Sequence, residues 1–153
     1  MRLGVSFWVC LVFLGVTSAV APTPAAAQVD PGVQTGILLD PDQFFFGGNI
    51  ETAPLVDRLH FRPGVDIGLG DDSTLVAGNF DFIYAFPGAS GWNLYVGGGP
   101  SINWYDFDDG GSDMEGGFNI LIGARQNSRL SFEFRVGMEG SPDLKFGVGY
   151  TFR

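Results

Sequence analysis

Strict alternation of apolar and polar residues near the C-terminus constrains the fold of this chain most strongly. Between residues 131 and 139 every second residue is apolar, and the alternation resumes after the turn-forming residues 140–143. Alternate side chains of a β-strand point to opposite faces, so each run predicts a strand with one apolar and one polar face. The two runs are expected to form a hairpin whose apolar face needs a nonpolar environment.

The upstream chain has the same organisation. Alternating segments are separated by short clusters of turn-forming residues, and none has a sustained helical period, which predicts an all-β chain. Eight antiparallel strands can close as an up-and-down barrel, and several are long enough for the ~9–11 residues that a tilted strand needs to cross a bilayer. The expected strands are 33–39, 43–51, 58–69, 74–86, 92–105, 116–126, 131–139 and 144–153, with the longest connection at 106–115.

The N-terminal segment resembles a secretory signal. A basic residue at position 2, an apolar run over 5–20 and small residues over 21–27 predict a signal peptide, residues 1–27, cleaved after Ala27. A retained membrane anchor is the alternative. Residues 28–153 then form one barrel domain. Cys10 is the only cysteine, so cleavage would leave no thiol for a disulfide or a metal.

Charge excludes one class of partner and sorts along the predicted barrel. A formal net charge of -9 argues against nucleic-acid binding. Connections at one end of the barrel are acidic. The connections at the other end, 52–57, 87–91 and 127–129, have Asp57 as their only acidic residue. Longer loops of outer-membrane barrels face outward, so the acidic end is expected to face outward. The acidic residues are Asp40, Asp42, Asp71, Asp72, Asp106, Asp108, Asp109, Asp113, Glu115 and Asp143.

The polar face of the strands carries charges of both signs. In a membrane barrel this face would line a narrow lumen, where opposite charges are expected to pair and close the passage. A general diffusion pore is therefore not expected. The predicted lumen charge network comprises Arg62, Asp66, Asp81, Arg125, Glu133, Arg135, Glu139 and Lys145.

Aromatic residues near the strand ends suit the two interfaces of a membrane. The expected interfacial residues are Tyr84, Phe86, Trp92, Trp104, Tyr150 and Phe152. Two prolines fit a closed sheet poorly, because Pro63 and Pro100 each lack a ladder donor. The segment 97–100 is expected to form a bulge or kink.

Three segments, 61–72, 95–100 and 145–153, resemble the porin-like outer-membrane β-barrel domain family of Gram-negative-type bacteria, which includes opacity-type proteins. The resemblance extends from about Phe44 to the C-terminus. It implies an eight-stranded monomer in contact with outer-membrane lipid and lipopolysaccharide. It also implies a C-terminal signal for the barrel-assembly machinery, although this chain ends in Arg153 and not in an aromatic residue. The signal residues would be Phe146, Val148, Tyr150 and Phe152.

Catalysis and cofactors are not expected. His60 is the only histidine and would lie on the lumen face near the periplasmic end, where hydrogen bonding is its ordinary role. The acidic connection 106–115 resembles a calcium loop, but it lacks the third acid that an EF-hand requires before the glycine and the glutamate at the twelfth position. A solvated acidic loop and a weak Ca²⁺ or Mg²⁺ site that bridges to lipopolysaccharide are the two alternatives.

The sequence therefore predicts a non-catalytic outer-membrane barrel with an envelope-structural or surface-interaction role and a plugged lumen. The alternative is a soluble periplasmic β-barrel that binds a hydrophobic ligand, with the same aromatic residues lining its core.

Overall fold

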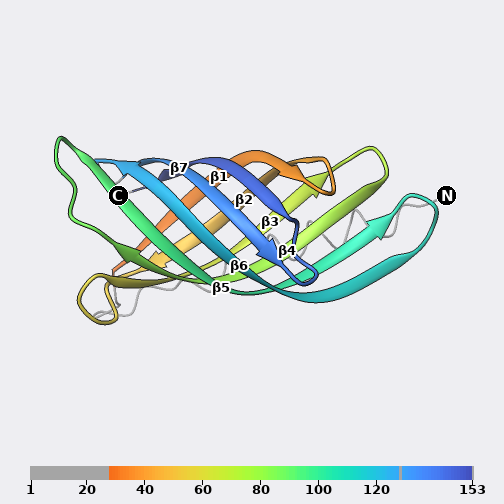
Figure 1. The fold of residues 1–153 in the computed structure, drawn as a ribbon, viewed down its shortest axis with the longest axis horizontal. Coiled ribbons are helices and arrows are strands. Elements are labelled where there is room, and N and C mark those ends of the chain that lie inside the picture. Colours follow the sequence, from red (N-terminus) through yellow and green to blue (C-terminus); the bar gives the residue numbers. More distant parts are fainter. Residues whose placement is uncertain (1–27, 128, 153) are drawn as a thin grey trace.

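The computed structural model describes residues 28–127 and 129–152, which form a closed barrel of eight antiparallel strands in chain order (Figure 1). The all-β, up-and-down prediction is confirmed. The expected signal peptide, residues 1–27, lies outside the described residues, and none of the described residues forms a helix able to cross a membrane. The strands are β1 (Val29–Leu39), β2 (Gln43–Thr52), β3 (Leu59–Leu69), β4 (Ser73–Ala85), β5 (Trp92–Phe107), β6 (Ser112–Gln126), β7 (Leu130–Met138) and β8 (Leu144–Thr151).

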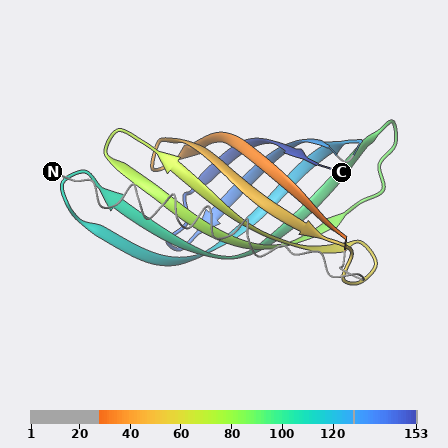
Figure 2. The ribbon, with the colours of Figure 1, turned by 180° about the vertical axis from the view of Figure 1, so that it is seen from behind.

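Pairing of β1 with β8 closes the barrel. The register joins Gly32 to Thr151, and the Phe152 amide donates to the Pro31 carbonyl at 2.8 Å just beyond it. The first and last described residues therefore lie at one end, called here the terminus end. Opposite views show the strands strongly tilted around the barrel (Figures 1 and 2). The other end carries the acidic connections and is called the loop end.

Alternation along each strand places the apolar residues outside. Phe82, Phe134 and Phe146 are 46%, 41% and 50% exposed, while Glu133 and Arg135, neighbours of Phe134 along β7, are buried. Aromatic side chains lining an internal core would be shielded from the surface. The alternative with an aromatic-lined core is therefore wrong, and the polar parity faces the interior.

The largest differences from the predicted strand boundaries are at the start of β1 and at the β5–β6 connection. β1 begins at Val29 and not at residue 33, and most of the expected connection 106–115 is strand. Tyr105 pairs with Asp113 and Trp104 pairs with Met114, so the β5–β6 ladder continues to a short turn. This hairpin projects furthest at the loop end (Figure 1). Backbone pairing holds these acidic residues in the strand conformation. Their side chains are exposed to water, so the strand buries none of their charges.

Of the bulge or kink predicted at 97–100, the bulge is wrong. In the β4–β5 ladder Asn79 pairs with Ser101, and Phe82 pairs with Gly98. These pairs lie on either side of a two-residue interruption and belong to the same register. No extra residue is therefore inserted there, and inward and outward positions keep their alternation through β5.

Both prolines sit where one neighbouring ladder is already interrupted. Pro100 is opposite Phe80 in the unpaired part of the β4–β5 ladder. Pro63 lies one residue beyond the end of the β2–β3 ladder, whose last pair is Asn49 with Gly64. A missing amide hydrogen at these positions removes no ladder bond on that side. The closed sheet therefore accommodates both prolines without a change of register.

Gly99 allows β4 and β5 to approach closely at this interruption. A Cβ on Gly99 would overlap the Phe80 carbonyl oxygen, whereas one on Gly78 would come no closer than 3.9 Å to Ile102. We expect Gly99→Ala to lower the free energy of unfolding by about 1–3 kcal/mol through a forced backbone shift. Urea unfolding in detergent micelles measures this, with Gly78→Ala as the matched control. Equal stability of the two variants would contradict the close approach.

Candidate functional site

The barrel interior buries four acidic and four basic side chains among the described residues. Equal numbers allow every charge to be paired, which matters because an unpaired buried charge is costly. Seven of the eight are residues that the sequence placed in the lumen, and Glu51 is the eighth. They are Glu51, Arg62, Asp66, Asp81, Arg125, Glu133, Arg135 and Lys145.

Four of these residues form a tetrad at the centre of the lumen. Arg62 donates from Nη2 to Glu133 Oε2 at 2.6 Å, and Arg135 donates from Nη2 to Glu133 Oε1 at 2.9 Å. Arg135 also contacts Asp81 through both terminal nitrogens, at 3.3 and 2.8 Å. Arg62 lies 3.7 Å from Asp81. The tetrad, Arg62, Asp81, Glu133 and Arg135, thus joins β3, β4 and β7.

Tyr95 connects the tetrad to a second ion pair toward the terminus end. Its hydroxyl donates to Glu133 Oε2 at 3.0 Å, and the guanidinium carbons of Arg62 and Arg125 lie 5.8 and 5.1 Å from its ring centroid. Arg125 forms two hydrogen bonds to Glu51, at 2.9 and 2.6 Å. These contacts combine cation–π attraction with a bidentate ion pair.

Glu51 was missing from the predicted network. Its position shares the inward parity of β2, which was the only available signal. Its partner Arg125 is 74 residues away in the sequence. Pairing at that separation follows from barrel closure and not from any local pattern.

Toward the loop end, Lys145 donates a hydrogen bond to Asp66. Asp66 also accepts from Gln34 Nε2 at 2.6 Å and from Asn79 Nδ2 at 2.8 Å. The Lys145 ammonium lies 4.1 Å from the Phe45 ring centroid. Phe45 belongs to the buried apolar layer of the loop end, which comprises Leu38, Phe45, Leu75 and Ala77.

Glu139 was wrongly assigned to the lumen. β7 ends at Met138, and Glu139 is exposed in the following turn with φ 45°. The left-handed backbone conformation breaks the alternation of the strand at this residue. The inward parity read from the sequence therefore stops one residue earlier.

His60 lies on the inward face near the terminus end. Its Nδ1 is 2.8 Å from the Thr52 carbonyl oxygen and 3.8 Å from Glu51 Oε1. Within residues 28–127 and 129–152, no three His, Cys, Asp or Glu side chains are close enough together to hold a metal ion.

The expected interfacial aromatics lie on the outer face and gather mainly at the terminus end. Trp92 stacks against Phe132 with ring centroids 6.0 Å apart, and Tyr150 meets Phe152 edge-on at 5.2 Å. Tyr84 and Phe86 form a similar pair at 5.1 Å. Trp104 is the member near the loop end. The residues of the expected assembly signal share the outward parity of β8 and its extension: Phe146, Val148, Tyr150 and Phe152.

Solved structures share this architecture, although no protein-family model and no curated protein sequence matches the chain. Neisserial surface protein A (NspA) aligns at 17% identity and a TM-score of 0.61, over 81% of this chain and 96% of its own. The N-terminal β-barrel domain of Pseudomonas aeruginosa OprF aligns at 20% identity and a TM-score of 0.60, over 83% and 100%. The outer membrane enzyme PagL aligns at 13% identity and a TM-score of 0.54, over 81% and 99%.

This chain has the fold of small eight-stranded outer-membrane β-barrels. The family resemblance is confirmed at that level, and membership of the porin-like family stays a prediction. The expectation that the chain is not an enzyme is contradicted by this comparison, because the outer membrane enzyme PagL shares the fold. At 13% identity the likeness concerns the fold alone, so the barrel architecture does not exclude catalysis.

The tetrad predicts that two glutamates close together in the sequence contribute very differently to the free energy of unfolding. Glu133→Gln removes a buried charge that contacts Arg62, Arg135 and Tyr95, and should lower the free energy of unfolding by about 3–5 kcal/mol. Glu139→Gln, in the exposed turn, is the matched control and should change it by less than about 0.5 kcal/mol. Urea unfolding of both variants in micelles checks this. Similar small effects would show that the tetrad contributes little.

Proposed function

We propose that this chain is a small β-barrel protein of a bacterial outer membrane, with an envelope-structural or surface-interaction role and a lumen closed by its own side chains. The apolar outer surface carries this proposal. Every strand exposes large apolar residues outward, and a soluble protein rarely exposes such a continuous apolar surface. One example from each strand is Ile37, Phe44, Leu69, Phe82, Leu94, Ile120, Phe134 and Phe146.

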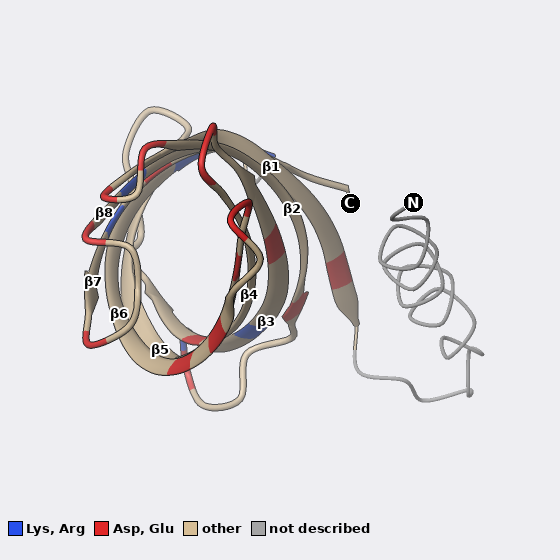
Figure 3. Ribbon diagram, turned by 90° about the vertical axis from the view of Figure 1, so that its right-hand side faces the viewer, with Lys and Arg blue, Asp and Glu red and all other residues tan. Residues whose placement is uncertain are grey.

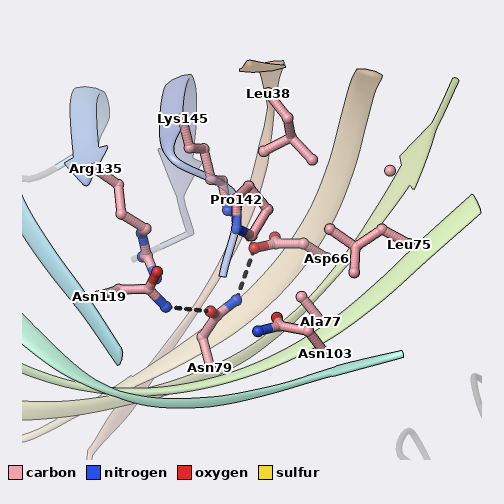
Figure 4. A pocket seen from close by; sticks show the side chains of 11 residues that line it. Leu38, Asp66, Leu75, Ala77, Asn79, Asn103, Asn119, Arg135, Pro142 and Lys145 are labelled. Carbon is pink, nitrogen blue, oxygen red and sulfur yellow. Dashed lines mark hydrogen bonds and ion pairs between the residues drawn. The ribbon is translucent and has the colours of Figure 1, made fainter. Parts of the chain in front are cut away.

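The packing of the interior supports a closed lumen. Eight strands leave an interior just wide enough for side chains, and here paired charges and two apolar clusters occupy it. A cavity of about 20 Å³ in the loop-end half has room for only about one or two water molecules (Figure 4). Diffusion of solutes through such an interior would require the ion pairs to separate.

Charge at the two ends supports one orientation in the membrane. The exposed side chains at the loop end of the described chain include eleven acidic and no basic residues, and the acidic ones are visible as red segments in Figure 3. Arg58 and Arg129 are exposed at the terminus end. By the rule for outer-membrane barrels, the loop end faces outward. The acidic residues are Asp40, Asp42, Asp71, Asp72, Asp106, Asp108, Asp109, Asp113, Glu115, Glu139 and Asp143.

The proposed surroundings follow from these surfaces. Acyl chains of outer-membrane lipid and lipopolysaccharide contact the apolar outer face, and the signal peptide directs export. The outward apolar residues of β8 present the assembly signal to the barrel-assembly machinery. The protein acts as a monomer, and weak divalent-cation binding at the acidic loops accompanies contact with lipopolysaccharide.

Arginine substitutions on the outer face test whether lipid surrounds the barrel. Ile120 is 53% exposed in the middle of β6, and Gln126 is exposed at the terminus end of the same strand. In lipid vesicles, Ile120→Arg should lower the free energy of unfolding by about 2–4 kcal/mol, and the control Gln126→Arg by about 0–1 kcal/mol. Urea titration of the vesicle-inserted protein measures both. Recovery from the soluble periplasm without detergent, with Ile120→Arg neutral in buffer, would refute the proposal.

Labelling of single cysteines tests the proposed orientation. Ser112 is exposed beside the β5–β6 turn, and Ala89 is exposed in the β4–β5 connection at the opposite end. In intact cells, a membrane-impermeant maleimide should label Ser112→Cys and leave Ala89→Cys unlabelled until the outer membrane is permeabilised. Outer-membrane fractionation and heat-modifiable gel migration confirm that each variant is folded. The reverse labelling pattern would show the opposite orientation.

A further inference from the structure

The connection between β2 and β3, residues 53–58, exposes two large apolar side chains at the terminus end. Leu55 is 54% exposed, and Val56, at 71%, is the most exposed large apolar residue of the described chain. The other connections of the barrel have Phe86 as their only large apolar residue. Two adjacent apolar side chains exposed to this degree gain free energy from contact with a nonpolar environment.

Backbone hydrogen bonds hold this connection in a defined turn. The Leu55 amide donates to the Leu59 carbonyl at 2.7 Å, and the Leu59 amide donates to the Val56 carbonyl at 2.9 Å. Asp57 has φ 51°, a left-handed conformation that reverses the chain between these bonds. The turn itself therefore keeps the two apolar side chains outside the barrel.

The turn continues the apolar outer surface of the barrel. Leu59, the first residue of β3, pairs with Tyr84, one of the aromatic residues expected at the membrane interface. Viewed from the loop end, the connection extends sideways beyond the outline of the barrel wall, below β3 (Figure 3). A turn that extends sideways at the end of a membrane barrel lies along the bilayer interface, where apolar side chains can enter the acyl region.

Charge beside the turn suits a phospholipid headgroup. Arg58 is exposed and follows Val56 by two positions, and Arg129 is also exposed at this end. A guanidinium group binds phosphate oxygens through paired hydrogen bonds. The acidic loop end would instead repel a phosphate. In the proposed orientation, the terminus end meets the inner leaflet of the outer membrane, which consists of phospholipid.

We propose that the β2–β3 connection is an interfacial lipid anchor, in which Leu55 and Val56 enter the boundary between headgroups and acyl chains and Arg58 binds a headgroup phosphate. The anchor holds this side of the barrel at a fixed depth in the phospholipid leaflet. This inference rests on the proposed function, because it requires the barrel to lie in a membrane. It adds a lipid contact made by a connection to those made by the barrel wall.

Quenching of a fluorophore by brominated lipid tests the anchor. The dye NBD is attached to Val56→Cys, and the protein is inserted into vesicles of phosphatidylcholine and phosphatidylglycerol whose acyl chains are brominated close to the headgroup. Most of the emission should be lost, because the brominated chains contact the dye. Ala89→Cys, in the β4–β5 connection of the same end, is the matched control and should keep its emission. All variants also carry Cys10→Ser, so that the dye has a single attachment site.

Two further substitutions show whether the chain itself, and not the dye, makes the contact. Leu55→Ser removes the neighbouring apolar side chain and should restore part of the emission at Val56→Cys. Arg58→Glu should also restore part of it, because headgroup phosphates repel the new carboxylate. Arg58→Lys keeps the positive charge and should leave the quenching unchanged.

A dye on Ile120→Cys, in the middle of β6, separates failure of the anchor from failure of the proposed function. Quenching of this dye by lipid brominated at mid-chain, without quenching at Val56→Cys, would refute the anchor alone. Absence of quenching at both sites would refute the membrane location as well.

Three other results would overturn the anchor. The first is equal quenching at Val56→Cys and Ala89→Cys. The second is quenching at Val56→Cys that Leu55→Ser or Arg58→Glu leaves unchanged. The third is shielding of the dye from water that increases with protein concentration and does not respond to bromine, because this would indicate a second copy of the chain on the turn.

Discussion

Closure of an antiparallel sheet on itself forces every second side chain into a narrow interior. With eight strands that interior accommodates little more than side chains, so large inward residues need small neighbours. Tyr95 lies over Gly123, and Phe45 lies over Gly147, where an added Cβ would approach the ring. The inward glycines of this chain are thus the counterpart of its few large inward residues.

Charge pairing across the lumen then fixes which strands face each other. Arg62 and Glu133 are separated by 71 residues, and Asp66 and Lys145 by 79, so these contacts form only when the barrel is closed. A slip of one residue in any strand would turn its charges toward the outer surface. In lipid that arrangement would be far more costly than in water. The same ion pairs that fill the lumen therefore also specify the register.

Alternation in the sequence was sufficient to predict the number and order of the strands, because the period of two is a local property. It also placed seven of the eight buried charges on the inward face. Which buried charges pair with each other could not be predicted, since Glu51 meets Arg125 only when the barrel closes. Alternation also fails where the backbone leaves the strand conformation, as at Glu139. The β5–β6 hairpin was underestimated because acidic residues were interpreted as a loop.

Residues outside the alternating pattern remain the source of functional variety on this fold. NspA, the OprF domain and PagL share the barrel at 13–20% identity, and one of them is an enzyme. The barrel wall must satisfy the same closure and burial constraints in each case. Side chains at the rims are free of those constraints. In this chain the loop-end rim is acidic throughout, and the β5–β6 ladder extends it furthest. Contacts with other molecules should therefore be sought first along that hairpin.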